Sequence, residues 1–407
     1  MDHRRRTLLA SLAIVGIFLA VQLGAVALVE PFERGGLQGV ENTDDPSLSI
    51  LYVGAILVAT LFMLAAIRYG GESILRLIII FAGVYISYFV FAALVPASGS
   101  VSGIPVETLV AVVGALGLGA TLYLYPEWYV IDAAGVVMGI GAAGLFGITF
   151  GILPALVLLT VLAVYDAISV YGTEHMLTLA SGVMDMRVPV VFVVPLSLSY
   201  SFLDAEKPES VDGGGEDDTD DEGDNGADAD GESKAGADAD DVNGETGGEN
   251  PEIPTSPEEI DVETLGTLTP EQVEKIDDEL LAEADLGEEE LDELDEQTRE
   301  AVTGGERDAM FIGLGDAVMP TILVASAAFF LDVGPTLSLF GISASLPVLG
   351  AMAGTILGLV VLLWLVQKGR AHAGLPLLNG GAIGGYLLGA LVSGLSLVEA
   401  LGLGGFL

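Results

Sequence analysis

The sequence predicts an all-α polytopic membrane protein with about nine transmembrane helices and one long acidic loop between the sixth and seventh. Two observations support this fold class: 52% of the 407 residues are hydrophobic, yet the formal net charge is −43. Both can hold only if the charge is segregated, and most of the 57 acidic residues do lie between Asp204 and Asp308. The rest of the chain is an apolar body with few charges.

Nine segments approach the roughly 20 apolar residues that a helix needs to cross a bilayer. They cover residues 7–29, 48–67, 77–95, 108–124, 129–147, 152–171, 310–331, 346–366 and 375–397. A further apolar patch, 188–203, contains two prolines, and we expect it to lead into the loop or lie at the membrane interface. The predicted domains are therefore an N-terminal membrane part (1–203), an acidic loop (204–308) and a C-terminal membrane part (309–407).

The short loops predict the orientation, because cytoplasmic loops carry an excess of Lys and Arg. In the nine-span topology only Arg34 lies on one side, and the other side carries Arg4, Arg5, Arg6, Arg68, Arg76, Lys368 and Arg370. We therefore expect a multi-pass protein of the cell membrane, with the N-terminus and the acidic loop in the cytoplasm and the C-terminus outside. A cleaved signal peptide at 7–29 is the alternative, which the length of this apolar run disfavours.

The acidic loop divides into two parts. Residues 204–252 have almost no large apolar side chain, so we expect disorder. Further on, Thr269-Pro270-Glu271-Gln272 predicts a capped helix start. A second amphipathic piece is indicated by Leu286, Leu291, Leu294 and Val302. We favour a solvated linker suited to high salt over a regulatory, partner-binding segment.

Several site classes are excluded or disfavoured by composition. The chain has no cysteine, which rules out disulfides and thiolate chemistry. None of its three histidines stands at metal-ligand spacing, so we predict no metal and no cofactor. The acidic charge argues against nucleic acid as a partner.

Two aspartates stand where hydrocarbon is expected, in Tyr165-Asp166 and in Gly313-Leu314-Gly315-Asp316. A carboxylate inside a membrane helix is costly and indicates a functional site. The topology places both near the cytoplasmic third of their spans, and a neighbouring pair of carboxylates can share one proton. The ionised member can activate water while the protonated one polarises a carbonyl group.

Expectations for the neighbouring residues follow from their chemistry. Gly313 and Gly315 should let a substrate or helix backbone approach Asp316 closely. Tyr165 could hydrogen-bond near Asp166 or simply pack, and packing is slightly favoured. Asp132, near the start of the fifth span, should extend its side chain to the interface.

These motifs resemble the presenilin and signal peptide peptidase family of intramembrane aspartyl proteases. The resemblance implies nine spans, with catalytic aspartates in the sixth and seventh, here Asp166 and Asp316, separated by a variable loop. The family's Pro-Ala-Leu motif at the ninth span is matched by Leu375-Pro376-Leu377-Leu378, with Leu377 in place of alanine. The run from Gly315 to Pro320 resembles the signal peptide peptidase branch, whereas the expected orientation resembles the presenilin branch. The chain thus looks like an archaeal, haloarchaeal presenilin-like homologue.

The resemblance also implies the partners. Substrates would be single-span membrane proteins or signal-peptide-like segments, cleaved within the lipid bilayer without a cofactor. The sequence makes no prediction of oligomeric state. Because Pro376 lacks an N–H and biases Leu375 away from helix, we expect Gly374–Leu378 to be an extended strand that pairs with substrate. Asn379 and the glycines after it should let this strand approach the aspartates. A plain helix start is the alternative for Pro376.

Two other functions use similar residues. A secondary transporter or channel could employ the aspartates as proton or cation sites, but no inverted repeat is evident. A prepilin-type peptidase also uses Gly-x-Gly-Asp, but it would need its aspartates at the membrane surface, which the depth of Asp166 disfavours.

Overall fold

The computed structural model describes two units of the chain separately. One comprises Met1–Ser210 with Asp308–Leu407, and the other is Val211–Arg307. The described residues are 3–38, 43, 45, 47–69, 71–95, 99–101, 103–172, 190–196, 254, 256, 260–268, 270–273, 276, 280, 284, 294, 298, 309–331, 333, 336–339, 342–367 and 373–403.

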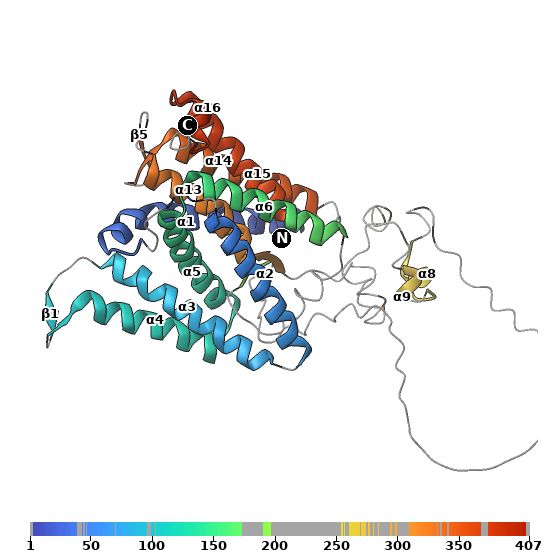
Figure 1. Cartoon of the computed structure of the whole chain (residues 1–407). Helices are drawn as coiled ribbons and strands as arrows, with labels where there is room; N and C mark the ends of the chain where they lie inside the picture. Colours follow the sequence, from blue (N-terminus) through green and yellow to red (C-terminus); the bar gives the residue numbers. More distant parts are fainter. Residues whose placement is uncertain are drawn as a thin grey trace, which may run out of the picture. The chain divides into compact units, whose positions relative to one another are not determined.

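The first unit is a bundle of apolar helices (Figure 1). Eight of its helices are long and apolar enough to cross a membrane, and a shorter apolar helix, α13 (Leu314–Phe330), completes the predicted series of nine. The eight are α1 (His3–Arg34), α2 (Ser47–Arg68), α3 (Glu72–Leu94), α4 (Val106–Leu124), α5 (Trp128–Thr149), α6 (Ile152–Gly172), α14 (Leu346–Val366) and α15 (Gly374–Val392). The predicted all-α membrane fold is confirmed.

The seventh predicted span is shorter than expected at its start. Ala309–Gly313 forms strand β4, which pairs antiparallel with β3 (Val191–Pro195) and places Val191 opposite Gly313. The apolar patch predicted at 188–203 thus contributes a strand. This strand pairs with the first residues of the expected seventh span. The sequence did not predict this, because an apolar run alone does not distinguish a strand from a helix.

The ninth span also ends earlier than predicted, at Val392. After Gly394, with a positive φ of 90°, the short helix α16 (Leu397–Ala400) begins in a reciprocal capping box between Ser396 and Glu399. The Tyr386 hydroxyl donates to the Ala400 carbonyl at 2.7 Å, which holds α16 against α15. Two small hairpins complete the described strands: β1 (Ser100–Val101) with β2 (Ile104–Pro105), and β5 (Thr336–Leu339) with β6 (Ile342–Ser345).

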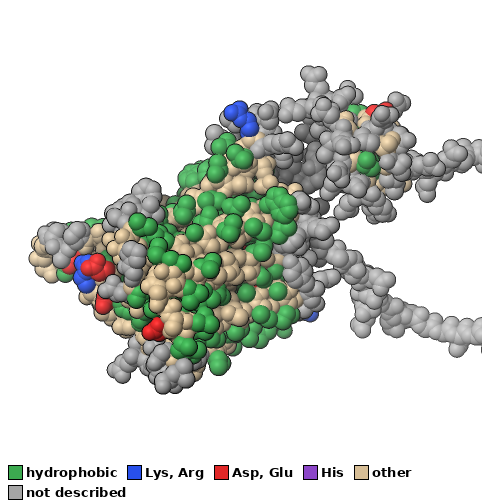
Figure 2. Space-filling model, turned by 90° about the horizontal axis from the view of Figure 1, so that it is seen from above, with side chains coloured by type: hydrophobic (Ala, Val, Ile, Leu, Met, Phe, Trp, Pro, Cys, Tyr) green, Lys and Arg blue, Asp and Glu red, His purple; other side chains and the backbone are tan. Residues whose placement is uncertain are grey.

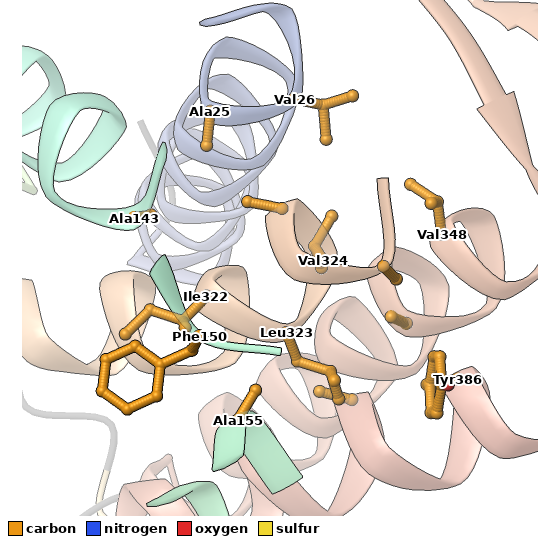
Figure 3. Close-up of a cluster of buried hydrophobic side chains, with 14 of the residues drawn as sticks. Ala25, Val26, Ala143, Phe150, Ala155, Ile322, Leu323, Val324, Val348 and Tyr386 are labelled. Carbon is orange, nitrogen blue, oxygen red and sulfur yellow. The ribbon is translucent and has the colours of Figure 1, made fainter. Parts of the chain in front are cut away.

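The core of the bundle is built around α13. Figure 3 shows Ile322, Leu323 and Val324 of α13 among side chains from five surrounding segments: Ala25 and Val26, Ala143 and Phe150, Ala155, Val348, and Tyr386. Figure 2 shows hydrophobic side chains over the face of the bundle in view, with few charges among the described residues. An apolar exterior of this kind suits contact with lipid rather than water.

Glycines join α14 and α15 in the closest helix contact of this unit. Three glycines of each helix face the backbone of the other, spaced four apart: Gly350, Gly354 and Gly358 on α14, and Gly381, Gly385 and Gly389 on α15. A Cβ on Gly354 would overlap the Gly381 carbonyl, and the reverse holds for Gly381 and Gly354. The Gly-x-x-x-Gly patterns here therefore serve close packing, as small residues do between membrane helices.

The second unit contains a small apolar cluster within the acidic loop. Its buried side chains are Ile260, Leu265, Leu268, Val273, Ile276 and Leu294. Helix α8 (Val262–Leu265) is capped by Asp261, which accepts from the Thr264 N–H at 2.7 Å, and α9 (Pro270–Val273) begins at the predicted proline. Residues 204–252, Thr269, Leu286, Leu291 and Val302 lie outside the described residues.

Candidate active site

Asp166 lies in the last third of α6 with its side chain turned into the protein. Only 6% of the residue is exposed. Its Oδ2 accepts a hydrogen bond from the backbone N–H of Leu375, with 3.0 Å between N and Oδ2. That amide is in the first turn of α15 and has no partner within its own helix. One bond therefore satisfies both a buried carboxylate and an otherwise unpaired donor.

Asp316 stands at the junction between β4 and α13, as the third residue of the helix. Gly313 is the N-cap, and the half-buried Asp316 folds back onto it. A Cβ on Gly313 would lie 3.3 Å from Oδ2 of Asp316, and the carboxylate interacts with the Gly313 amide. An acidic side chain in the first turn is also favoured by the helix dipole.

The first turn of α15 brings the two carboxylates to one place. A Cβ on Gly374 would lie 3.4 Å from Oδ1 of Asp316, while the next residue, Leu375, donates to Asp166. Helices α6, α13 and α15 pack against one another. The two aspartates singled out from sequence therefore share one site, at the positive end of a helix.

The residues around Asp316 have different surroundings. The missing side chain of Gly313 leaves room for the Asp316 carboxylate itself. Leu314 donates its N–H to Val190 at 2.7 Å and packs its side chain against α5, near Gly139. Gly315 is exposed, with open space where a Cβ would be. The prediction that glycines allow a close approach thus applies at Gly313 to the neighbouring carboxylate, and Gly315 leaves an open position beside Asp316.

The expectation of an extended Gly374–Leu378 strand is wrong. Helix α15 begins at Gly374, after an extended N-cap at Ala373, and Pro376 lies in its first turn. A proline is tolerated there because the N–H that it lacks would have no helical partner. Leu375 and Leu377 are half-buried, and Leu378 is fully buried in an apolar cluster.

Asn379 also differs from its expected role. Its fully buried amide donates to the Leu159 carbonyl of α6 at 3.0 Å. This bond lies one turn further along α15 than the bond between Leu375 and Asp166, and about two turns away from it on α6, so the two bonds join these helices at separate places. An asparagine in an apolar run was the available sequence signal.

Tyr165 lies on another face of α6 from its neighbour. It is 38% exposed, whereas Asp166 is 6% exposed. The ring therefore turns outward, and the structure does not bring it together with the two carboxylates.

Asp132 has a partner in the structure that the sequence did not predict. It was expected to extend to the interface, but it is half-buried, and its Oδ1 accepts the backbone N–H of Val193 at 2.8 Å. The acid in an apolar span was visible in the sequence, whereas its partner was not, because β3 was not predicted as a strand.

Comparisons with known proteins identify the family of this chain. The family model described as "Signal-peptide peptidase, presenilin aspartyl protease" matches residues 15–219 and 285–395. A solved structure described as a presenilin family intramembrane aspartate protease in the C222 space group is 29% identical, with a TM-score of 0.52, over 94% of this chain and 99% of that one. One in the P2 space group is 27% identical, with a TM-score of 0.49, over 94% and 97%. A search of curated proteins found no significant match.

The family match covers well over half of the chain on both sides of the acidic loop. It includes Asp166, Asp316 and the first turn of α15, where the carboxylates meet. The chain belongs to the signal peptide peptidase and presenilin family, and the protein is an intramembrane aspartyl protease, a hydrolase.

Proposed function

We propose that Asp166 and Asp316 are the catalytic pair of this protease, and that it cleaves peptide bonds within or next to the transmembrane helices of its substrates. The observation that carries this proposal is the first turn of α15, where Leu375 donates to Asp166 and the adjacent Gly374 lies beside the Asp316 carboxylate. Two acids held together in an apolar bundle have no evident packing role that an apolar residue could not fill.

The pair hydrolyses the peptide bond through one shared proton. The ionised carboxylate takes a proton from a water molecule, whose oxygen attacks the carbonyl carbon, while the protonated carboxyl gives its proton to the carbonyl oxygen. The tetrahedral intermediate then loses its C–N bond: the amine nitrogen takes up the proton of the pair, and one hydroxyl of the intermediate gives its proton to the other carboxylate. The products are one carboxyl and one amino terminus, and the pair regains its single proton.

We also propose the following finer properties, from the sequence and from its resemblance to the family. Substrates are single-span membrane proteins or signal-peptide-like segments, which would reach the pair from the bilayer. The N-terminus and the acidic loop face the cytoplasm and the C-terminus faces outside, as the basic residues indicate. The domains divide at 203/204 and 308/309, and the acidic loop suits the cytoplasm of a halophilic archaeon.

The family membership does not favour the alternatives, a transporter or channel and a prepilin-type peptidase. Cleavage of a single-span reporter by purified protein tests the proposal directly. Asp166→Ala and Asp316→Ala should each reduce the cleavage rate by about 10³-fold or more, and the double variant should be no worse than either, because the pair acts as a unit. Asp45→Ala, which removes a carboxylate outside the spans, is the matched control. Near-normal cleavage by either single variant would contradict the assignment.

A further inference from the structure

One face of α5 contacts strand β3 and the start of α13, the helix that carries Asp316. Asp132, Gly135 and Gly139 are three and four residues apart, so they line the same side of the helix. Asp132 accepts the N–H of Val193, a Cβ on Gly135 would lie 2.8 Å from the Phe192 ring, and one on Gly139 would lie 3.3 Å from Leu314. The first two of these residues thus face β3, and the third faces the first residue of α13.

The hydrogen bond to Asp132 leaves β3 on the side away from β4. In an antiparallel pair, alternate residues turn their N–H groups away from the partner strand. Val190 accepts a bond from Leu314 on the partner side, so Val191 and Val193, which pair with Gly313 and Phe311, turn their N–H groups away from β4. A two-stranded sheet is marginal alone, and an outward N–H in an apolar setting needs a partner. Asp132 supplies that partner and ties the sheet to α5.

The β3–β4 sheet is connected to Asp316 by one backbone hydrogen bond and by side-chain packing. The pairing of β3 with β4 continues beyond the strand, where Leu314 donates its N–H to the Val190 carbonyl at 2.7 Å. The side chains of Phe192 and Leu314 pack in one apolar cluster with Ala317, the residue after Asp316. A shift of β3 away from α5 would therefore move the first turn of α13, which carries the Asp316 carboxylate.

We propose that Asp132 is a positioning residue of the protease: by accepting the Val193 N–H, it docks the β3–β4 sheet on α5 and so fixes Asp316 relative to Asp166. The proposal rests on the proposed function of Asp316. Asp132 has no contact with either catalytic carboxylate among the described hydrogen bonds, and its effect passes through the sheet. A misplacement on the order of 1 Å at a reacting group can lower a rate by about 10²-fold, so a modest loosening of the sheet is sufficient.

The test distinguishes loss of the hydrogen-bond acceptor at Asp132 from loss of its negative charge and from a general loss of fold. Asp132→Asn keeps an oxygen that can accept the Val193 N–H, whereas Asp132→Leu has a similar size and no acceptor. Ala133→Leu, at the exposed neighbouring position on α5, is the matched control. For each variant, kcat and KM are measured on the single-span reporter, and amide hydrogen exchange is measured at 190–196 and 309–314.

We expect Asp132→Leu to lower kcat about ten-fold or more with little change in KM. Asp132→Asn and Ala133→Leu should stay within about three-fold of the unmodified protein, because the acceptor is retained in both. Exchange should accelerate at 190–196 and 309–314 only in Asp132→Leu. If Asp132→Leu does not fold, Gly135→Ala, which keeps Asp132 but displaces the Phe192 ring, should give the same loss of kcat.

Two outcomes overturn the proposal. One is unchanged kcat and unchanged exchange in Asp132→Leu, or in Gly135→Ala if that variant is needed. The other is an equal loss in Asp132→Asn, which would assign the effect to the charge. Asp316→Ala, run in parallel, keeps the two proposals distinct: if it still cleaves, the catalytic assignment fails, and the exchange data still decide whether Asp132 holds the sheet.

Discussion

The backbone N–H of Leu375 donates a hydrogen bond to Oδ2 of Asp166, across 209 residues of sequence, with 3.0 Å between the two atoms. The donor is one of the first-turn amides that a helix leaves without an internal partner. Asp166 is therefore held by the start of α15 as well as by its own helix. Any change in where α15 begins should alter the geometry of the aspartate pair.

Cleavage should depend on pH with a bell-shaped profile. At low pH both carboxyl groups carry protons and no base remains, and at high pH both are ionised and no acid remains. The measurement is kcat on the single-span reporter across pH at constant high salt. Thermal unfolding over the same range is the control for loss of fold. A flat profile would argue against a pair that shares one proton.

Pro376→Ala should lower cleavage while the protein still inserts. Alanine restores an N–H and removes the ring that would clash with the carbonyl four residues earlier in a longer helix, so α15 can extend towards earlier residues. The Leu375 amide would then bond to a carbonyl four residues earlier instead of Asp166. We expect a loss of about ten-fold in kcat, consistent with a small displacement of a reacting group.

Pro347→Ala is the matched control for that variant. Pro347 also lies in the first turn of a long helix, but at the far end of the contact between α14 and α15, next to Gly389. Its replacement should leave cleavage within about two-fold, because no carboxylate depends on that turn. Equal cleavage by both proline variants would leave Pro376 as a simple helix start.

Gly374 should tolerate alanine better than valine. A Cβ there meets Asp316 and Leu362 at 3.4 Å, which is ordinary contact, but the two γ-methyl groups of valine would need space that the Asp316 carboxylate occupies. We expect Gly374→Ala to keep most activity and Gly374→Val to lose about ten-fold or more in kcat. Gly380→Val, at an exposed position of the same helix with nothing within 4 Å, should be nearly silent. A silent Gly374→Val would mean that Asp316 is not confined by α15.

The glycine contact between α14 and α15 should be intolerant of a methyl group. In Gly354→Ala the new Cβ overlaps the Gly381 carbonyl, so the helices must separate along the whole contact. Overpacking of this kind typically destabilises by about 1–3 kcal/mol. The measurement is thermal unfolding in detergent, with Gly384→Ala, which faces open space, as the control. Equal melting temperatures for the two variants would contradict the observed helix spacing.

Deletion of residues 212–248 should leave insertion and cleavage largely intact. This stretch has almost no large apolar residue to bury, and the family match is interrupted between 219 and 285. The purified deletion variant is compared with one in which a Gly/Ser linker of equal length replaces the stretch. Loss of cleavage in both, with insertion preserved, would assign the loop a direct role.

The sequence by itself determined the membrane fold and the two aspartates of the site. Each of the nine segments depends on local length and apolarity, and the boundaries of α14 match those predicted. Asp166 and Asp316 stood out because a carboxylate in an apolar run is exceptional, whatever surrounds it. Both features are properties of short stretches of chain, which is why they could be identified without coordinates.

Only the tertiary structure decided how these stretches meet. That β4 replaces the first turn of the seventh span follows from its pairing with β3, more than a hundred residues earlier. That the first turn of α15 lies beside both Asp166 and Asp316 depends on the packing of three helices. The partner of Asp132 is likewise a backbone amide on a distant strand. Hydrogen bonds between remote segments depend on which helix faces pack together, and local composition does not determine this choice.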